Sequence, residues 1–135
     1  SNWSYGGWPE SGEIDIMEHV GYDPNVIHGS IHTKAYNHTI GTQKSASLNI
    51  PNATSSYHTY AIEWFADRID FYIDQYKYFT FNNENSGWEK WPFDKRFHLI
   101  LNVAVGGNWG GVQGIDVNAF PARMEVDFVR VYKKD

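Results

Sequence analysis

Three carboxylates lie close together near the start of the chain, in the segment Gly12-Glu13-Ile14-Asp15-Ile16-Met17-Glu18. Because acidic and apolar residues alternate, this segment predicts a β-strand rather than a helix. On a regular strand, however, Glu18 would share the face of the two isoleucines, where an unpaired carboxylate is costly. We therefore expect a one-residue β-bulge near Met17, which returns Glu18 to the face of Glu13 and Asp15.

The spacing of the two glutamates suits glycoside hydrolysis. A bulged strand places their Cα atoms about 13 Å apart. Two side chains that lean toward each other then leave about 5 Å between the carboxyl groups, the separation that retaining glycosidases use. Asp15 lies between Glu13 and Glu18, where it can hydrogen-bond to one of them. An acidic, solvated strand face or a Ca²⁺ site is the alternative for the same three residues.

Segments in the same order from end to end resemble the laminarinase-type enzymes of glycoside hydrolase family sixteen. The residues from Trp8-Pro9 through the acidic strand are similar to the family's active-site signature. The other matching segments are His28-Gly29-Ser30-Ile31-His32-Thr33, Tyr60-Ala61-Ile62-Glu63-Trp64, Asn102-Val103-Ala104-Val105-Gly106-Gly107-Asn108-Trp109-Gly110-Gly111 and Met124-Glu125-Val126-Asp127-Phe128-Val129-Arg130-Val131-Tyr132. The resemblance implies an all-β fold, a concanavalin A-like jelly-roll β-sandwich that cleaves β-glucans with retention.

By the same resemblance, Glu13 is the nucleophile, Glu18 is the general acid/base, and Asp15 assists the nucleophile. Trp8 matches a sugar platform next to the cleaved bond. His32 matches a position that faces the sugar beside the catalytic centre, although an ordinary sheet-face histidine is the alternative. His28 lies four residues before His32, but on a strand the two rings do not converge on one ion, so we do not expect zinc.

Three further residues are expected to bind substrate. Trp3 lies in the loop before Trp8 and extends its platform. Asn102 belongs to a matching segment, and Trp109 lies among glycines, where a core position is hard to arrange. Trp64 instead follows alternating residues and is predicted to lie in the core.

Asp127 is the candidate metal ligand. An exposed acid is the simple interpretation of a lone aspartate in an alternating segment. The resemblance implies a structural Ca²⁺ on the convex side of the sandwich, with Asp127 as its side-chain ligand and backbone carbonyls as the others. No catalytic cofactor is expected.

Composition agrees with a secreted all-β domain that binds polysaccharide. Aromatic residues make up 17% of the chain, and their rings can stack on the C–H faces of sugars. The net charge of -5 argues against nucleic acid or an anionic membrane as partner, and no apolar stretch approaches membrane-spanning length. The chain has no cysteine, which excludes disulfides and thiol catalysis.

Residues 1–135 are expected to form part of one glycoside hydrolase catalytic domain, without linker or repeat. The predicted strands are 13–19, 26–33, 58–65, 68–73, 76–80, 96–105 and 125–132, and we expect no amphipathic helix. Sandwich domains of this kind often run to roughly 200–250 residues. The resemblance therefore covers about the C-terminal half of the family's domain. We expect an incomplete jelly roll, or one completed by another chain or copy.

The function predicted from these residues is endo-hydrolysis of β-1,3-glucans such as laminarin, or of mixed β-1,3-1,4-glucans, by double displacement. The alternative is a non-catalytic β-glucan-binding module, or an inactive fragment, on the same sandwich. Glucan-recognition relatives lack the acid pair, so the presence of Glu13, Asp15 and Glu18 favours an enzyme. The cleft shows no obvious Arg/Lys cluster, which disfavours sulfated galactans as substrates.

Overall fold

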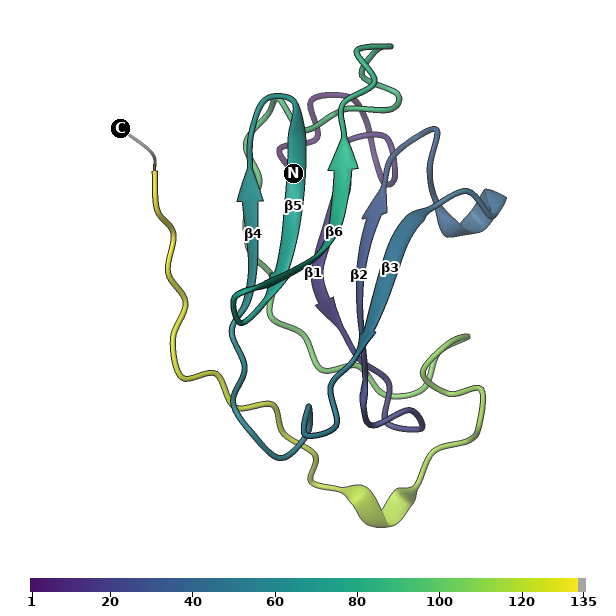
Figure 1. The fold of residues 1–135 in the computed structure, drawn as a ribbon. Coiled ribbons are helices and arrows are strands. Elements are labelled where there is room, and N and C mark those ends of the chain that lie inside the picture. Colours follow the sequence, from purple (N-terminus) through teal and green to yellow (C-terminus); the bar gives the residue numbers. More distant parts are fainter. Residues whose placement is uncertain (134–135) are drawn as a thin grey trace. The chain divides into compact units, whose positions relative to one another are not determined.

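The computed structural model describes residues 1–133. They divide into two units, Ser1–Leu99 and a second unit that begins at Ile100 (Figure 1). All of the strands among the described residues lie in the first unit, in two antiparallel sheets of three strands each. The described residues contain no helix that is long and apolar enough to cross a membrane.

The first sheet carries the acidic segment. Its strands are β1 (Glu13–Glu18), β2 (Val26–His32) and β3 (Lys44–Asn49), in the order β1-β2-β3. Successive residues of β2 point to opposite faces of the sheet. Ile27, Gly29 and Ile31 therefore share the face toward the core, and the residues between them share the face toward the acidic side chains.

The second sheet is a meander of β4 (Tyr60–Trp64), β5 (Arg68–Ile73) and β6 (Tyr76–Asn82). The turn Asp74-Gln75 joins β5 to β6, and Asp74 takes the left-handed conformation that aspartate tolerates better than most residues (φ 55°). The core lies between the two sheets. It consists of Ile31 from β2, Ile69 and Phe71 from β5, Phe81 from β6, and Trp91 and Phe93 from the loop that follows.

The second unit contains a short 3-10 helix, η2 (Val117–Ala119), and a turn at the glycine-rich segment predicted around Trp109. Gly106 and Gly107 both have positive φ (74° and 80°), which glycine adopts without strain. The Gly111 N–H donates to the Gly107 carbonyl at 3.1 Å and closes the turn.

Five of the seven predicted strands are confirmed, and their ends differ from the prediction by at most two residues. The predictions for 96–105 and 125–132 are wrong, because neither segment is in a β-ladder among the described residues. Alternation marks a segment that can form a strand, but the strand forms only against a hydrogen-bonding neighbour. The structure adds β3, a small and polar strand that sequence reasoning missed.

The prediction that Trp64 lies in the core is also wrong. Its side chain is 39% exposed. The indole N–H donates to the Phe93 carbonyl at 3.1 Å, and the ring packs edge-on against Phe93 and Phe97. Trp64 therefore lies at the margin of the core, where its polar N–H is satisfied by the loop that follows β6.

Candidate active site

The register between β1 and β2 places the acidic side chains. Asp15 pairs with Ser30 and Glu18 pairs with His28, so three steps along β1 match two steps along β2. The extra residue is the β-bulge that the sequence predicts near Met17. It brings Glu18 to the face of Asp15, where the Ser30 hydroxyl donates to Glu18 Oε2 at 3.0 Å.

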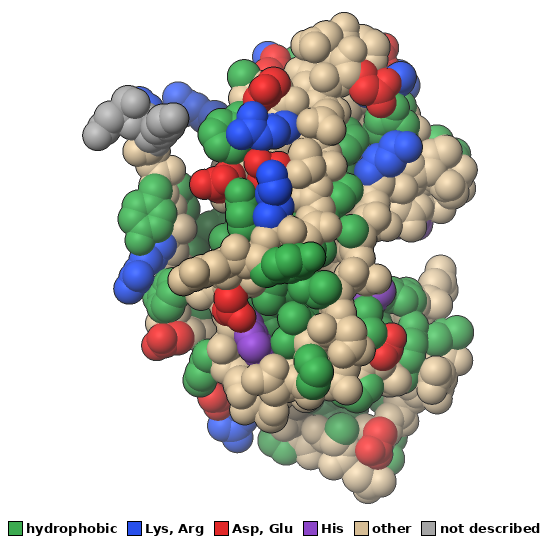
Figure 2. Space-filling view, viewed as in Figure 1, with side chains coloured by type: hydrophobic (Ala, Val, Ile, Leu, Met, Phe, Trp, Pro, Cys, Tyr) green, Lys and Arg blue, Asp and Glu red, His purple; other side chains and the backbone are tan. Residues whose placement is uncertain are grey.

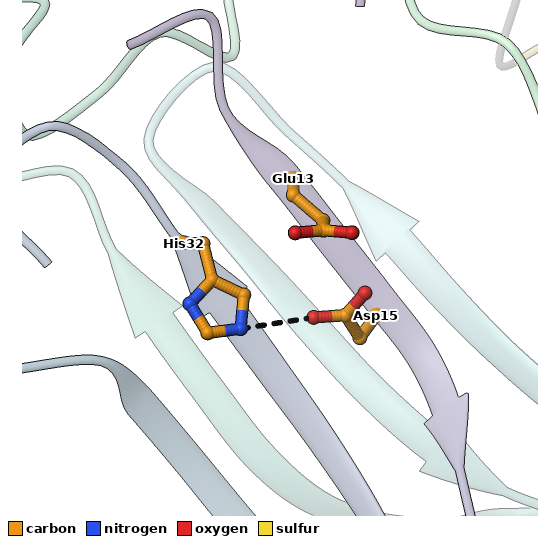
Figure 3. Close-up of side chains that lie close together, drawn as sticks. All are labelled: Glu13, Asp15 and His32. Carbon is orange, nitrogen blue, oxygen red and sulfur yellow. Dashed lines mark ion pairs between the residues drawn. The ribbon is translucent and has the colours of Figure 1, made fainter. Parts of the chain in front are cut away.

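Glu13, Asp15 and His32 form a compact cluster across the same two strands (Figure 3). His32 pairs directly with Glu13 in the register, and its Nε2 lies 3.3 Å from Asp15 Oδ2. One ligand atom from each of the three side chains lies within 4.8 Å of the others. The sequence-predicted neighbours Glu13, Asp15, Glu18 and His32 are thus brought to one face of the sheet.

The pKa values of Asp15 and His32 are both raised in this cluster. Burial raises the pKa of Asp15, the hydrogen bond from His32 offsets this in part, and the negative charge of Glu13 raises it again. For His32, burial alone would lower the pKa, but the hydrogen bond and charge of Asp15, with the charges of Glu13 and Glu18, outweigh burial and raise it. Asp15 is therefore placed to share a proton between His32 and Glu13.

Glu18 has the properties of a general acid. Burial raises its pKa, and the nearby charge of Asp15 raises it further, while the Ser30 hydrogen bond acts in the opposite direction. A carboxyl group that keeps its proton to higher pH can deliver that proton to a leaving oxygen. Sequence reasoning missed Ser30, although its position on β2 between His28 and His32 puts it on the same face as both.

Trp8 approaches the cluster from the loop before β1. Its indole Nε1–H donates to Glu13 Oε2 at 2.6 Å, a contact that sequence reasoning did not predict. The ring lies 5.9 Å from the His32 ring and 5.0 Å from the ring of His38, measured between centroids. His38 begins the 3-10 helix η1 (His38–Ile40) and was also missed, because no motif in the sequence connects it with the acidic strand.

The other predicted substrate-binding residues are Trp3, Asn102 and Trp109, and each is described within its own unit. Trp3 lies in the same N-terminal loop and is 64% exposed, as a sugar platform would be. Asn102 and Trp109 belong to the second unit, and both are exposed there. Their predicted role in binding stays a prediction.

Metal ligation was predicted at Asp127, which is exposed in the second unit. Within residues 1–133, a single group of three or more acidic or histidine side chains is close enough to hold an ion, and it is Glu13, Asp15 and His32. An imidazole in that group does not match the all-oxygen coordination of Ca²⁺. Asp127, whose expected partners are backbone carbonyls, is not in this group of side chains. Calcium binding stays a prediction.

Comparisons with known proteins agree with the motifs and with the fold. The family model "Glycosyl hydrolases family 16" matches residues 2–130. A β-glucanase of Rhodothermus marinus is 54% identical over 131 residues, which are 93% of this chain and 46% of that protein. The chain thus spans about half the length of that relative.

Solved structures also match the fold, among them the following two. The laminarinase of Rhodothermus marinus aligns with a TM-score of 0.85 and 52% identity over 87% of this chain and 50% of its own. SCLam, a non-specific endo-β-1,3(4)-glucanase, aligns with a TM-score of 0.81 and 51% identity over 84% of this chain and 43% of its own. These matches confirm the jelly-roll class that the sequence predicted. The match of the family model over nearly the whole chain, with the acidic strand bulged as the chemistry requires, shows that the chain belongs to glycosyl hydrolases family 16.

Proposed function

We propose that this chain carries the catalytic carboxylates of a retaining endo-hydrolase of β-1,3-glucans such as laminarin, or of mixed β-1,3-1,4-glucans. One observation carries the proposal: the bulge in β1 turns Glu18, a carboxyl with a raised pKa, to the face of Glu13 and Asp15. Three carboxylates on one sheet face repel each other, so fold stability does not explain their arrangement.

The reaction is a double displacement. In the first step Glu13 attacks the anomeric carbon while Glu18 gives its proton to the leaving glycosidic oxygen, which forms a covalent glycosyl-enzyme. In the second step Glu18 takes a proton from water, and the water oxygen displaces Glu13 from the anomeric carbon. Asp15, paired with His32, lies beside Glu13 in both steps, and the proton that the pair holds determines the charge that Glu13 faces.

The substrate class is supported by the relatives and by charge. The matching proteins named above are a β-glucanase, a laminarinase and an endo-β-1,3(4)-glucanase. On the face drawn in Figure 2, Lys and Arg side chains are interspersed with Asp and Glu rather than gathered into one basic field. A neutral glucan suits this surface better than a sulfated galactan does. Secretion is part of the proposal, because such polymers are too large to enter a cell.

The test is reducing-sugar release from laminarin and lichenan, with agarose and carrageenan as comparison substrates. We expect Glu13→Gln and Glu18→Gln each to lower the rate by orders of magnitude while long glucans still bind. Glu63→Gln is the matched control, since Glu63 lies on β4 in the other sheet and accepts a hydrogen bond from Tyr72. Half the parent's rate in the Glu13→Gln protein would overturn the mechanism.

A β-glucan-binding module without activity is the second candidate, favoured by the exposed rings of Trp3 and Trp8. Its signature is laminarin binding with no sugar release from the parent chain. An NMR time course distinguishes the mechanisms when hydrolysis occurs: the β-anomer must form first if the reaction retains configuration.

A further inference from the structure

We propose that Trp8 is a positioning residue for Glu13: its indole N–H holds carboxylate oxygen Oε2 and leaves Oε1 directed at the anomeric carbon. This inference rests on the proposed function, and it gives Trp8 a role beyond that of a stacking platform. The 2.6 Å contact between Trp8 Nε1 and Glu13 Oε2 carries it. Hydrogen bonds of this length to an ionised group are roughly twice as strong as neutral ones.

The indole differs from the other neighbours of Glu13 in that it can only donate. Asp15, whose pKa is raised by burial, can donate to Glu13 only while it holds its proton. His32 contacts Asp15 rather than completing a bond to Glu13. The Trp8 N–H therefore provides the donor to the nucleophile that does not depend on pH.

The loop that carries Trp8 is tied down on both sides of it. The Ser11 N–H donates to the Gly7 carbonyl at 3.2 Å, and the Gly12 N–H donates to the Pro9 carbonyl at 3.0 Å. The Ser11 hydroxyl also donates to the Gly6 carbonyl at 2.7 Å. Because these bonds end where β1 begins, they hold the Trp8 backbone relative to the strand that carries Glu13. The indole itself packs against the rings of His32 and His38.

The bond persists through the reaction without moving a proton. When Glu13 Oε1 forms its bond to the anomeric carbon and the glycosidic bond breaks, Oε2 becomes the carbonyl oxygen of the ester and still accepts from the indole. When water later displaces Glu13, the negative charge that returns to the carboxylate is again met by the N–H. A donor already in place for a leaving carboxylate lowers the barrier of this second step.

The test separates the N–H from the ring. Trp8→Phe keeps an apolar plate but removes the donor, so we expect kcat on laminarin to fall by roughly ten- to a hundredfold with little change in KM. Trp8→Ala should raise KM as well. Trp88→Phe is the matched control, because Trp88 stacks on Tyr5 (5.0 Å between centroids) away from the acidic cluster. An unchanged kcat in Trp8→Phe overturns the inference.

A second measurement needs no turnover. In a ¹H–¹⁵N NMR spectrum, the Trp8 indole peak is identified by its loss in Trp8→Phe. Glu13→Gln should then move this peak upfield, because the charged acceptor is gone, and should leave the Trp88 peak in place. A Trp8 peak that does not move overturns the inference whether or not the chain hydrolyses glucan. A parent chain that binds but does not hydrolyse laminarin overturns the proposed function instead, and the NMR shift still decides whether Trp8 holds Glu13.

Discussion

At the scale of single residues, Glu13 and Glu18 are chemically alike and differ in their neighbours. Glu13 receives the N–H of Trp8, whereas Glu18 is partly buried, faces the charge of Asp15 and receives the weaker donor Ser30. Glu18 therefore keeps its proton to higher pH than an ordinary glutamic acid. This difference is what a nucleophile and a general acid on one strand require.

The Ser30 hydroxyl stabilises the ionised form of Glu18, so removing the hydroxyl should change the pKa of Glu18 in one direction only. We expect Ser30→Ala to raise the pKa of Glu18 further. Because Glu18 must be protonated for the first step, the alkaline limb of the kcat/KM profile on laminarin should move to higher pH. Ser55→Ala, in an exposed loop, is the control. A limb that moves to lower pH, or stays in place, would exclude the role of Ser30.

The sequence predicts where the acidic residues lie, but it does not predict which groups donate hydrogen bonds to them. Alternation and the cost of burying Glu18 are enough to predict the bulge, and the matching segments place His32 nearby. The donors Ser30 and Trp8 depend on which way a hydroxyl or an indole turns, and that is decided by packing. His38 reaches Trp8 through the fold of the η1 segment, which carries no sequence signal of its own.

At the scale of elements, β2 supports both the site and the core. Its polar residues face β1's carboxylates, and Gly29 lies opposite Tyr78 of β6. Because one face of such a strand is polar and the other is apolar, its residues alternate in the sequence, and strands with strong alternation were predictable. β3 was not, because Lys44–Asn49 is small and polar and is held by its register with β2. The segments 96–105 and 125–132 have the pattern of strands, but pattern alone does not supply a ladder partner.

Gly29 leaves room for Tyr78 of β6 to approach β2 closely. A Cβ added there would lie 2.3 Å from the Tyr78 hydroxyl and 3.0 Å from a ring carbon of Phe71. We expect Gly29→Ala to lower the free energy of unfolding by about 1–3 kcal/mol, measured by urea denaturation. Tyr78→Phe should restore much of the loss, because the buried hydroxyl has no hydrogen-bond partner among the described residues. Equal losses in the single and double variants would contradict the contact.

At the scale of the whole molecule, the described residues include a strand edge without a ladder partner and exposed apolar side chains, both of which can contact another chain. β1 is the first strand of its sheet, so one of its backbone edges has no ladder partner among the described strands. In the second unit, apolar side chains remain exposed; Val131, for instance, is 83% exposed. Unpaired strand edges and exposed apolar side chains favour pairing with another chain or copy.

We therefore expect the chain to associate in a concentration-dependent manner. Light scattering should give a mass that rises above that of the monomer as concentration increases. Lysines introduced together at Val129 and Val131, both exposed in the second unit, should shift the association to higher concentration, because charge opposes pairing of apolar surfaces. If the chains associate through the edge of β1 instead, these substitutions will leave the association unchanged. Laminarin binding should then fall as the oligomer forms. A monomeric mass at every concentration, a cooperative melt and full laminarinase activity from this chain alone would refute the expectation, and would mean that the three-stranded sheet carrying β1 needs no partner to hold its carboxylates in place.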